Sequence, residues 1–426
     1  MLSKRSERYL TPSMSYIPTF IKFMNNQYNV DSNPSGDLAV CVAENCLVSD
    51  ILLEKIKSFN DYSLSVLNYT SCTGMPRLKS IMSKFLSEKL FCIDNIVDEN
   101  NIVISSGCCA LLHLLSILLF DANEGILIQT PYYPAFDHDF WDLGDVICKE
   151  VNIDRSKRKH PFELEEEHLF DEDSWNHAYI ESMNNGCKIK AILITNPSNP
   201  LGVIYKQDQL LKLIEWARNK SLHIIVDEIY GLSIFDDNNK FTSIVNLLND
   251  NLKDDVHILW SFSKDLGSSG LRLGSLYTQN KILLKSLDSA NDSFMVSNLM
   301  QELAIGILSD TIWIENYLKE LKIRLKRSHD TLKIALEEMN LTVVNASASI
   351  FVFVDFSTLL KEQTYDEEKK LHQELVEVGL LFTPGKACHC QYPGYFRICY
   401  AWVPYISLLE AIRRLRIFVD KKKNNN

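Results

Sequence analysis

Short apolar runs alternate with longer amphipathic stretches through the middle of this chain. Seven runs rich in Ile, Val and Leu predict strands at 102–106, 126–129, 146–151, 190–195, 223–227, 257–261 and 273–278. Helical patterns lie between most of them, for example at 109–120 and 207–219. Apolar strands separated by helices are typical of a mostly parallel sheet that is covered on both faces. The pattern therefore predicts an α/β fold.

The last third of the chain has a different pattern. It predicts helices at 312–339, 367–378 and 406–418, and strands at 341–344, 350–355 and 396–400. We expect a smaller α+β domain here. The predicted division is an amino-terminal arm with part of the small domain (1–60), a large domain (61–310), the small domain (311–420) and a disordered tail (421–426). Residues 1–40 are expected to be an extended arm that packs onto the small domain, and 153–188 an irregular surface insertion.

Composition narrows the possible functions. The chain has 426 residues, 46% of them apolar and 23% charged, as in ordinary globular proteins. With 44 basic and 55 acidic residues the net charge is 44 − 55 = −11, which argues against nucleic acid and anionic membranes as partners. No apolar run approaches the roughly 18 residues of a membrane span. The 11 cysteines form no CxxC pair, so we expect reduced thiols in a cytoplasmic protein and no metal, even at Cys388-His389-Cys390.

One lysine lies where a ligand can reach it. Lys264 belongs to SFSKDLG (261–267), directly after a predicted strand, and glycines follow at 267, 270 and 274. Ligands of open α/β sheets bind at the carboxyl ends of the strands. Lys264 is usable there as an amine nucleophile if its surroundings lower its pKa. The alternative is a lysine that faces solvent in a loop.

Three other segments carry polar groups at strand ends or inside apolar runs. They are NPSNPLG (196–202), HIIVDEIY (223–230) and FRICY (396–400). Because strand-end loops of a parallel sheet converge at one edge, Asn199, Asp227 and Lys264 are expected to meet there. Arg397 stands inside an apolar run, where an unpaired charge is costly. The alternatives are a strand-end cap for Asp227 and a structural ion pair for Arg397.

Together these motifs resemble the aspartate-aminotransferase-like, fold-type I enzymes that use pyridoxal 5'-phosphate (PLP). SxSK…R, NPxNPxG and DExY are all present, and the resemblance extends over about residues 38–415. It implies a large PLP-binding domain with a mostly parallel seven-stranded sheet, plus a smaller α+β domain. It also implies a small-molecule amino-acid substrate.

The resemblance also implies a role for each polar residue. Lys264 would hold the PLP aldehyde as an imine and then act as the base at the substrate α-carbon. Asp227 would pair with the ring nitrogen, which makes the ring an electron sink. Asn199 and Tyr230 would bond to the ring hydroxyl. Arg397 would bind the substrate α-carboxylate through two parallel hydrogen bonds. Lys264, Asp227 and Tyr230 are the expected catalytic residues.

The phosphate of the cofactor needs an anion site. Residues 106–110 lie between a predicted strand and a predicted helix, so their N–H groups can bind an anion at the helix start. By resemblance, Ser261, Arg272, Cys108 and Cys109 also belong to this site. Cys109 is a departure, since relatives often have Thr or Ser there and a thiol is a weaker donor.

Two tyrosines complete the expected cofactor site. Tyr133 matches the aromatic residue that stacks on the ring, the alternative being an ordinary turn aromatic. Tyr69 matches a tyrosine that in many relatives reaches the phosphate of a neighbouring subunit. The resemblance therefore implies a homodimer.

Two segments are similar to 1-aminocyclopropane-1-carboxylate (ACC) synthases: AENCL (43–47) with DILLE (50–54), and PYYPAFD (131–137). Those enzymes convert S-adenosylmethionine to ACC and methylthioadenosine. Glu44 would then lie beside the substrate sulfonium; the alternative is a carboxylate at the entry of a helix over 49–58. His138, the tract 140–142 and Cys72-Thr73 depart from the plant pattern.

Other functions share this scaffold. The first is an aminotransferase of broad amino-acid specificity, and the second is a PLP β-lyase. A non-catalytic dimerisation or regulatory module is a hypothesis of another class. The fold does not decide between these reactions.

Overall fold

The largest of the three sheets in the described part of the chain has seven strands, as predicted. The structure is a computed structural model, and it describes residues 3–10, 14–59, 62–155, 161–162 and 169–425. The strands are β2 (Ile102–Ser105), β3 (Gly125–Gln129), β4 (Ile147–Val151), β5 (Ile189–Thr195), β6 (His223–Asp227), β7 (Val256–Ser261) and β8 (Gly274–Thr278), in the order β2-β8-β7-β6-β5-β3-β4. Only β8 runs antiparallel to its neighbours. Strands β2, β3, β7 and β8 are buried along their whole length, so both faces of the sheet are covered.

Five helices pack against this sheet: α3 (Pro76–Phe85), α4 (Cys108–Leu118), α5 (Phe136–Gly144), α6 (Glu172–Asn184) and α7 (Gln207–Asn219). Helix α10 (Lys281–Ala290) contacts α4, and α11 (Asn298–Ser309) contacts α3. Helix α4 begins directly after β2 and contacts α5, β7 and β8. Shorter helices are η1 (Lys4–Tyr9), η2 (Leu64–Leu67), η3 (Leu86–Phe91), η4 (Glu99–Asn101), α8 (Ile244–Leu247), α9 (Phe262–Asp265), η5 (Ser269–Leu271) and η6 (Asn291–Phe294).

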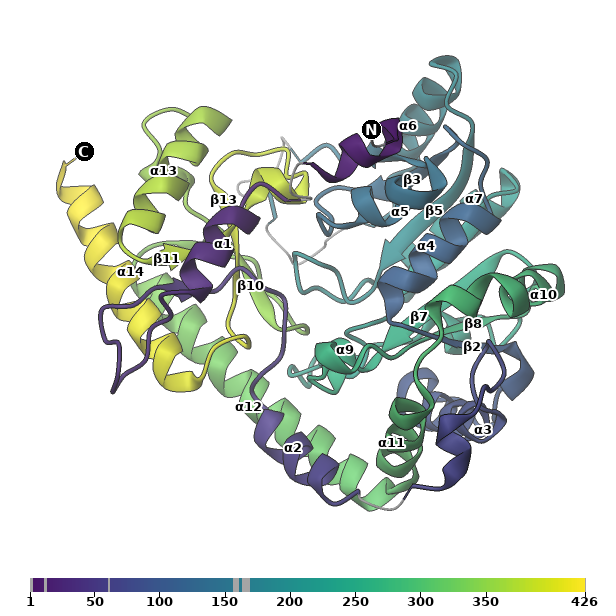
Figure 1. Ribbon diagram of the computed structural model, residues 1–426. Coiled ribbons are helices and arrows are strands. Elements are labelled where there is room, and N and C mark those ends of the chain that lie inside the picture. Colours follow the sequence, from purple (N-terminus) through teal and green to yellow (C-terminus); the bar gives the residue numbers. More distant parts are fainter. Residues whose placement is uncertain (1–2, 11–13, 60–61, 156–160, 163–168, 426) are drawn as a thin grey trace.

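The smaller, second unit is built on an antiparallel sheet. Its strands are β12 (Thr383–Pro384), β13 (Tyr395–Cys399), β10 (Phe351–Asp355) and β9 (Thr342–Val343), in that order. Its helices are α12 (Thr311–Glu338), η7 (Ser357–Leu359), α13 (Tyr365–Glu377), η8 (Gly385–Cys388) and α14 (Tyr405–Asn425). In Figure 1 the long helix α12 runs along the lower edge toward α14, and the two units lie side by side above it. The predicted boundary near residue 310 lies between α11 and α12.

The amino-terminal segment packs onto the second unit, as expected. Strand β1 (Leu38–Ala39) pairs in parallel with β11 (Leu380–Leu381), and α2 (Ser49–Lys57) follows. The expectation of an extended arm is wrong, because η1 and α1 (Ile17–Met24) are helical. Helix α1 has a proline in its first turn and buries Phe23, so a local helix forms where no period was visible in the sequence.

The expectation of an irregular insertion at 153–188 is wrong for its second half. Helix α6 occupies its second half, and the Asp171 carboxylate caps it by accepting from the Ser174 N–H at 3.0 Å. Trp175 is fully buried against Trp216 of α7. The charged side chains of this helix, Glu172, Asp173 and Glu181, are exposed. Residues 156–160 and 163–168 lie outside the described part of the chain.

Residues 421–425 are not a disordered tail. Helix α14 continues to Asn425, and Lys422 Nζ donates to Glu374 on α13 at 2.8 Å. Lys423 Nζ donates to the Met339 carbonyl at 2.7 Å. These contacts hold the last turns of the helix on the second unit. Within the described ranges, no helix combines the length and the apolar character that crossing a membrane requires.

Candidate active site

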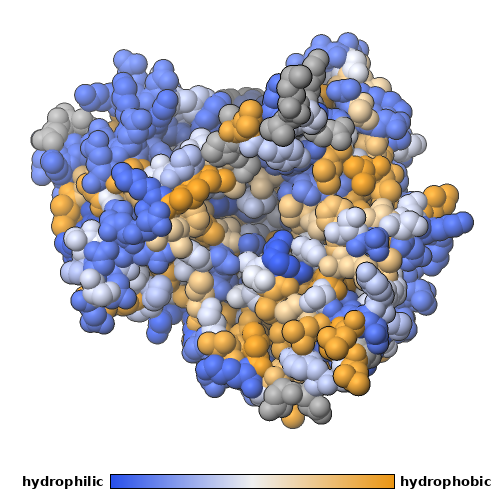
Figure 2. All heavy atoms as spheres, in the orientation of Figure 1, coloured by the Kyte–Doolittle hydropathy of each residue, from blue (hydrophilic) through white to orange (hydrophobic). Residues whose placement is uncertain are grey.

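Polar side chains from three parallel strands meet in one cavity of about 190 Å³. Strands β5, β6 and β7 are neighbours, and Asn199, Asp227 and Lys264 follow their carboxyl ends. All three line the cavity, as their strand-end positions predicted. Further lining residues from the predicted set are Cys108, Cys109, Tyr133, Tyr230 and Arg272. In Figure 2 the surface is hollowed between the two units.

Lys264 is held on the single-turn helix α9. The Ser261 hydroxyl caps this helix by accepting from the Ser263 N–H at 3.1 Å. Lys264 Nζ donates to the Ala43 carbonyl at 2.6 Å, and burial lowers the pKa of its amine. The neighbouring Asp265 is buried and accepts from Trp260 Nε1 at 2.8 Å, which fixes the turn. Lys264 is therefore not a lysine that faces solvent in a loop, and burial favours the neutral, nucleophilic amine.

Asp227 is a buried carboxylate at the end of β6, with 6% of its surface exposed. Its Oδ1 accepts from the Ile229 N–H at 3.1 Å, so it also caps the strand end. Burial raises the pKa of Asp227 to about 7. Burying a charged carboxylate costs free energy. A carboxylate that is nevertheless placed in a cavity lining is suited to bind a cationic or N–H group of a ligand.

Arg397 is a buried cation in the middle of β13. Its Nη1 donates to Asn199 Oδ1 at 2.9 Å, and its Nη2 donates to the carbonyl of Cys41 at 3.0 Å and to Thr383 Oγ1 at 3.2 Å. Its Nε has no partner, and it forms no ion pair within the described part of the chain. The structural ion pair considered for Arg397 is therefore absent from these residues. A buried guanidinium with unused donors suits a carboxylate ligand.

Asn199 connects Arg397 to the ring-binding side of the cavity. Its amide Nδ2 lies 3.5 Å from the hydroxyl of Tyr230, which is buried. Tyr133 lines the same cavity and packs edge-on against Phe136. These two rings and the Asn199 amide give the cavity an aromatic wall with hydrogen-bonding groups.

The segment predicted to bind an anion lies where β2 passes into α4. Gly107 precedes the helix with φ 94°, and a Cβ there would lie 2.8 Å from Arg272 Nη2, so the position requires glycine. Arg272 donates to the carbonyls of Ser106 at 3.1 Å and Ser269 at 2.9 Å. Its guanidinium therefore lies beside the first turn of α4, whose N–H groups have no partner within the helix. Cys108 is buried, and its thiol forms a hydrogen bond with the Ser261 side chain.

The Cys109 thiol does not stand free as a donor to that anion site. Its Sγ lies 2.8 Å from Asp139 Oδ1, on α5. The sequence analysis missed Asp139, which lines the cavity and is buried. The signal was its place six residues after Tyr133, on the inner face of a helix.

Four predicted residues are not in the cavity lining: Ser261, Arg397, Glu44 and Tyr69. Ser261 and Arg397 adjoin it through hydrogen bonds to the lining residues Ser263 and Asn199. Glu44 is half-buried in the loop that contacts Lys264, and its charge favours the charged form of that amine. It lies five residues before the first residue of α2, where Asp50 occupies the first turn, so the helix-entry alternative is not supported. Tyr69 is fully exposed.

Two contacts between distant segments were also missed. Tyr16, at the start of α1, is buried near Arg397, and burial raises its pKa to about 12. His389 follows η8, and its two ring nitrogens lie 2.7 Å from Asp137 on α5 and 2.8 Å from Glu150 on β4. The contacts of His389 join the two units.

Comparisons with known proteins all place the chain in the same family. Residues 21–415 match the family model described as aminotransferase class I and II. ACC synthase 8 of Arabidopsis thaliana is 33% identical, over 95% of this chain and 88% of the relative. ACC synthase 3 of Solanum lycopersicum is 31% identical, over 96% and 89%. A human protein named as a probable inactive ACC synthase-like protein 2 is 30% identical, over 94% and 70%.

Solved structures give the same fold. An aspartate aminotransferase from Thermus thermophilus matches with a TM-score of 0.78 and 17% identity, over 98% of this chain and 99% of that one. An aromatic aminotransferase from Pyrococcus horikoshii matches with a TM-score of 0.73 and 21% identity, over 91% and 96%. At these identities the likeness concerns the fold alone, which is the predicted aspartate-aminotransferase-like fold.

Proposed function

Because the chain belongs to the aminotransferase class I and II family and is similar to ACC synthases over most of its length, we propose that it acts on S-adenosylmethionine. The products would be ACC and methylthioadenosine. The observation that carries this proposal is a pair of opposite charges near Lys264. They are the buried cation of Arg397 and the carboxylate of Glu44.

The cofactor of this family is PLP, and the cavity residues fit it. PLP carries an aldehyde, a ring nitrogen, a ring hydroxyl and a phosphate. The cavity offers an amine of lowered pKa, a buried carboxylate, amide and phenol groups, and an anion site. We assign these to Lys264, Asp227, Asn199 with Tyr230, and Arg272 with the first turn of α4. When bound, PLP withdraws electrons from the substrate α-carbon and makes its proton removable.

The protein groups would then divide the work as follows. Arg397 binds the α-carboxylate and orients the α-carbon. The Lys264 amine takes the α-proton, since burial lowers its pKa and so favours the neutral form. The electron pair left at the α-carbon closes onto Cγ, the Cγ–S bond breaks, and methylthioadenosine leaves with that bonding pair. Tyr133 covers one face of the cavity and excludes water.

Glu44 is the proposed specificity residue. S-adenosylmethionine has a carboxylate and a permanent sulfonium, so its site needs one positive and one negative group. Glu44 belongs to the loop whose Ala43 carbonyl accepts from Lys264 Nζ at 2.6 Å. A carboxylate next to that loop contact can attract the sulfonium and hold the Cγ–S bond near the reacting carbon.

The test is a product analysis with two substrate sets. Purified protein is incubated with S-adenosylmethionine, and separately with an amino acid plus a 2-oxo acid. Equal amounts of ACC and methylthioadenosine, without amino-group exchange, are expected. Exchange alone would contradict the proposal in favour of an aminotransferase, and ammonia with a 2-oxo acid from one amino acid would favour a β-lyase. No product with any substrate would favour the non-catalytic module.

We also propose that the protein is a homodimer in which Tyr69 reaches the phosphate of the partner. Tyr69 is 100% exposed, and the neighbouring Leu64 and Leu67 of η2 are 84% and 80% exposed. Apolar side chains gather over η2 and α11 in the lower part of Figure 2. A second copy would cover them.

Light scattering tests this assembly. Leu64→Glu with Leu67→Glu should halve the molar mass, while Ile180→Glu, an exposed apolar position on α6, should not change it. A monomeric wild-type protein would contradict the dimer.

A further inference from the structure

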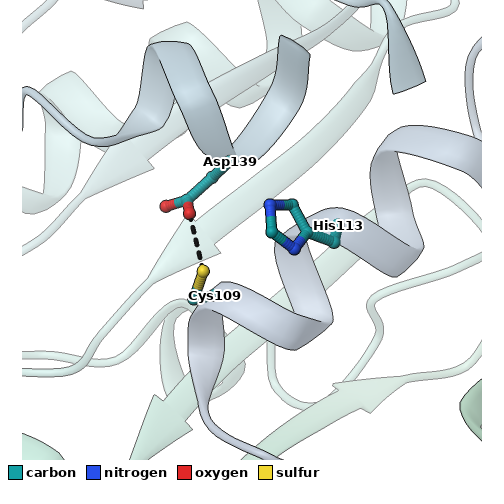
Figure 3. A group of neighbouring side chains, drawn as sticks. All are labelled: Cys109, His113 and Asp139. Atoms are coloured by element: carbon teal, nitrogen blue, oxygen red, sulfur yellow. Dashed lines mark hydrogen bonds between the residues drawn. The ribbon is translucent and has the colours of Figure 1, made fainter. Parts of the chain in front are cut away.

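Three metal-binding side chains converge between α4 and α5. Cys109 and His113 are four residues apart on α4, so they lie on one face of that helix. Asp139 faces them from α5, and one ligand atom of each residue lies within 4.8 Å of the others. Figure 3 shows the Cys109 sulfur directed at the Asp139 carboxylate, with a ring nitrogen of His113 turned toward the same carboxylate. Among the residues that the structure describes, Cys109 forms no disulfide, and neither His113 nor Asp139 forms an ion pair.

The negative charge of this cluster has no cationic partner among the described residues. Asp139 is only 6% exposed, and within the described ranges no Lys or Arg forms an ion pair with its carboxylate. Its one side-chain partner is the Cys109 thiol at 2.8 Å. A buried carboxylate without a cationic partner is costly. A metal ion that replaced the thiol proton would neutralise both groups, and that proton would leave to solvent.

We propose that Cys109, His113 and Asp139 bind one divalent cation of the zinc class. A thiolate and an imidazole favour Zn²⁺ or Co²⁺, whereas Mg²⁺ and Ca²⁺ prefer sites made of oxygen ligands. Three protein ligands leave one tetrahedral position open. Cys109 and Asp139 also line the cavity of Lys264 and Arg272, so the cation lies at the wall of that cavity. The sequence analysis expected no metal, because the cysteines form no CxxC pair. Cys109 and His113 are separated from Asp139 by 30 and 26 residues, so the sequence alone did not bring the three together.

The distances in the cluster are compatible with this proposal. Zinc–ligand bonds are about 2.0 to 2.3 Å, so tetrahedral ligand atoms stand roughly 3 to 4 Å apart. The sulfur and the carboxylate oxygen are 2.8 Å apart, so a metal ion between them would require them to separate slightly, and all three ligand atoms lie within 4.8 Å of one another. A change in the His113 side-chain rotamer is the main adjustment needed. His113 is half-buried, which leaves it room to turn.

Cobalt titration of the full-length, PLP-loaded protein tests the site. Tetrahedral Co²⁺ absorbs at longer wavelengths than the bound coenzyme, and metal analysis after dialysis gives the stoichiometry. We expect one Co²⁺ per chain, displaced by Zn²⁺ and not by Mg²⁺. Cys109→Ser and His113→Ala should each weaken binding at least about 10-fold, with proton release lost in Cys109→Ser.

The matched control is Cys72→Ser. Cys72 Sγ lies 3.7 Å from Asp292 Oδ1, which makes it a cysteine–aspartate pair without a histidine. This variant should bind Co²⁺ like the wild type. Circular dichroism and thermal unfolding without metal establish that each variant is folded. Equal binding by wild type, Cys109→Ser and His113→Ala would overturn the proposal, and so would the absence of any tetrahedral Co²⁺ spectrum. The titration needs no substrate, so it is independent of the reaction proposed above.

Discussion

The two sides of the candidate site are built in different ways. One side consists of strand-end residues of the seven-stranded sheet, where Asp227 ends β6 and Lys264 follows β7 on a single-turn helix. The other side is assembled from segments far apart in the sequence. Arg397 bonds to Asn199 across 198 positions and to Cys41 across 356. Tyr16 and Glu44 come from the amino-terminal segment.

This difference suggests a division of labour. The sheet side is fixed by main-chain register and carries the groups assigned to PLP. The other side depends on how the second unit and the amino-terminal segment sit against the sheet, and it carries the groups assigned to the substrate. Substitutions on the sheet side should therefore lower kcat for every substrate. Those on the other side should change KM and substrate choice.

The largest effect is expected for Asp227→Asn. An amide cannot keep the cofactor nitrogen protonated, so kcat should fall on the order of 10³-fold, or about 4 kcal/mol, for all substrates. The control is Glu228→Gln, the adjacent buried carboxylate, which bonds to Ser243 and Ile244 and does not line the cavity. It should cost stability and leave kcat of the folded enzyme unchanged. Equal losses of kcat in both variants would contradict the assignment of Asp227.

Arg397→Lys comes next. Lysine keeps the charge but cannot form two parallel bonds, so kcat/KM should fall about 10²-fold, mainly through KM. Arg218→Lys, which alters a guanidinium paired with Asp255 away from the cavity, serves as the control. A loss confined to kcat would mean that Arg397 does not bind the substrate carboxylate.

Glu44→Gln should have a smaller and selective effect. Loss of the carboxylate should weaken S-adenosylmethionine about 10-fold, because one charge interaction at a partly solvated site is removed. An uncharged competitor such as methionine should bind as before. Glu54→Gln, an exposed carboxylate on α2, is the control. If methionine and S-adenosylmethionine weaken equally, Glu44 is not the sulfonium partner.

His389→Gln tests the contact between the units and should affect stability rather than chemistry. Asp137 and Glu150 outweigh partial burial and raise the pKa of His389 from 6.5 to about 9. Because the folded protein binds this proton more tightly than the unfolded chain, the stabilisation is complete below pH 6.5 and is lost as the pH rises through about 9.

Denaturant unfolding at several pH values measures this contribution. Wild type should exceed His389→Gln by about 1 to 2 kcal/mol below pH 6.5, after allowance for solvent around a partly exposed pair. The two should converge above pH 9. His177→Gln, at an exposed histidine–glutamate pair, should show no such difference. A difference that does not depend on pH would contradict the ionic contact.

The sheet side could be predicted from the sequence, and the other side only in part. Asp227 and Lys264 follow continuous apolar runs, so local pattern places them at the same sheet edge. Arg397 was found because a charge inside an apolar run is unusual. Asn199 was also predicted as a site residue, but the hydrogen bond between the two was not. The positions of Asp139 and Tyr16 in the site depend on packing between distant elements, which the local hydrophobic pattern does not reveal. Helix α6 and the end of α14 were missed because most of their side chains are charged or polar. The few buried residues, such as Trp175, are too sparse to show a helical period in the sequence.

The account depends most directly on the covalent attachment of PLP to Lys264. Borohydride reduction of the purified protein, followed by proteolysis and mass spectrometry, locates the attachment. The account predicts a pyridoxyl-phosphate mass on the peptide that contains Lys264 and on no other lysine, and no labelled peptide from Lys264→Ala. Label on a different lysine, or an unlabelled Lys264 peptide from protein saturated with PLP, would contradict it.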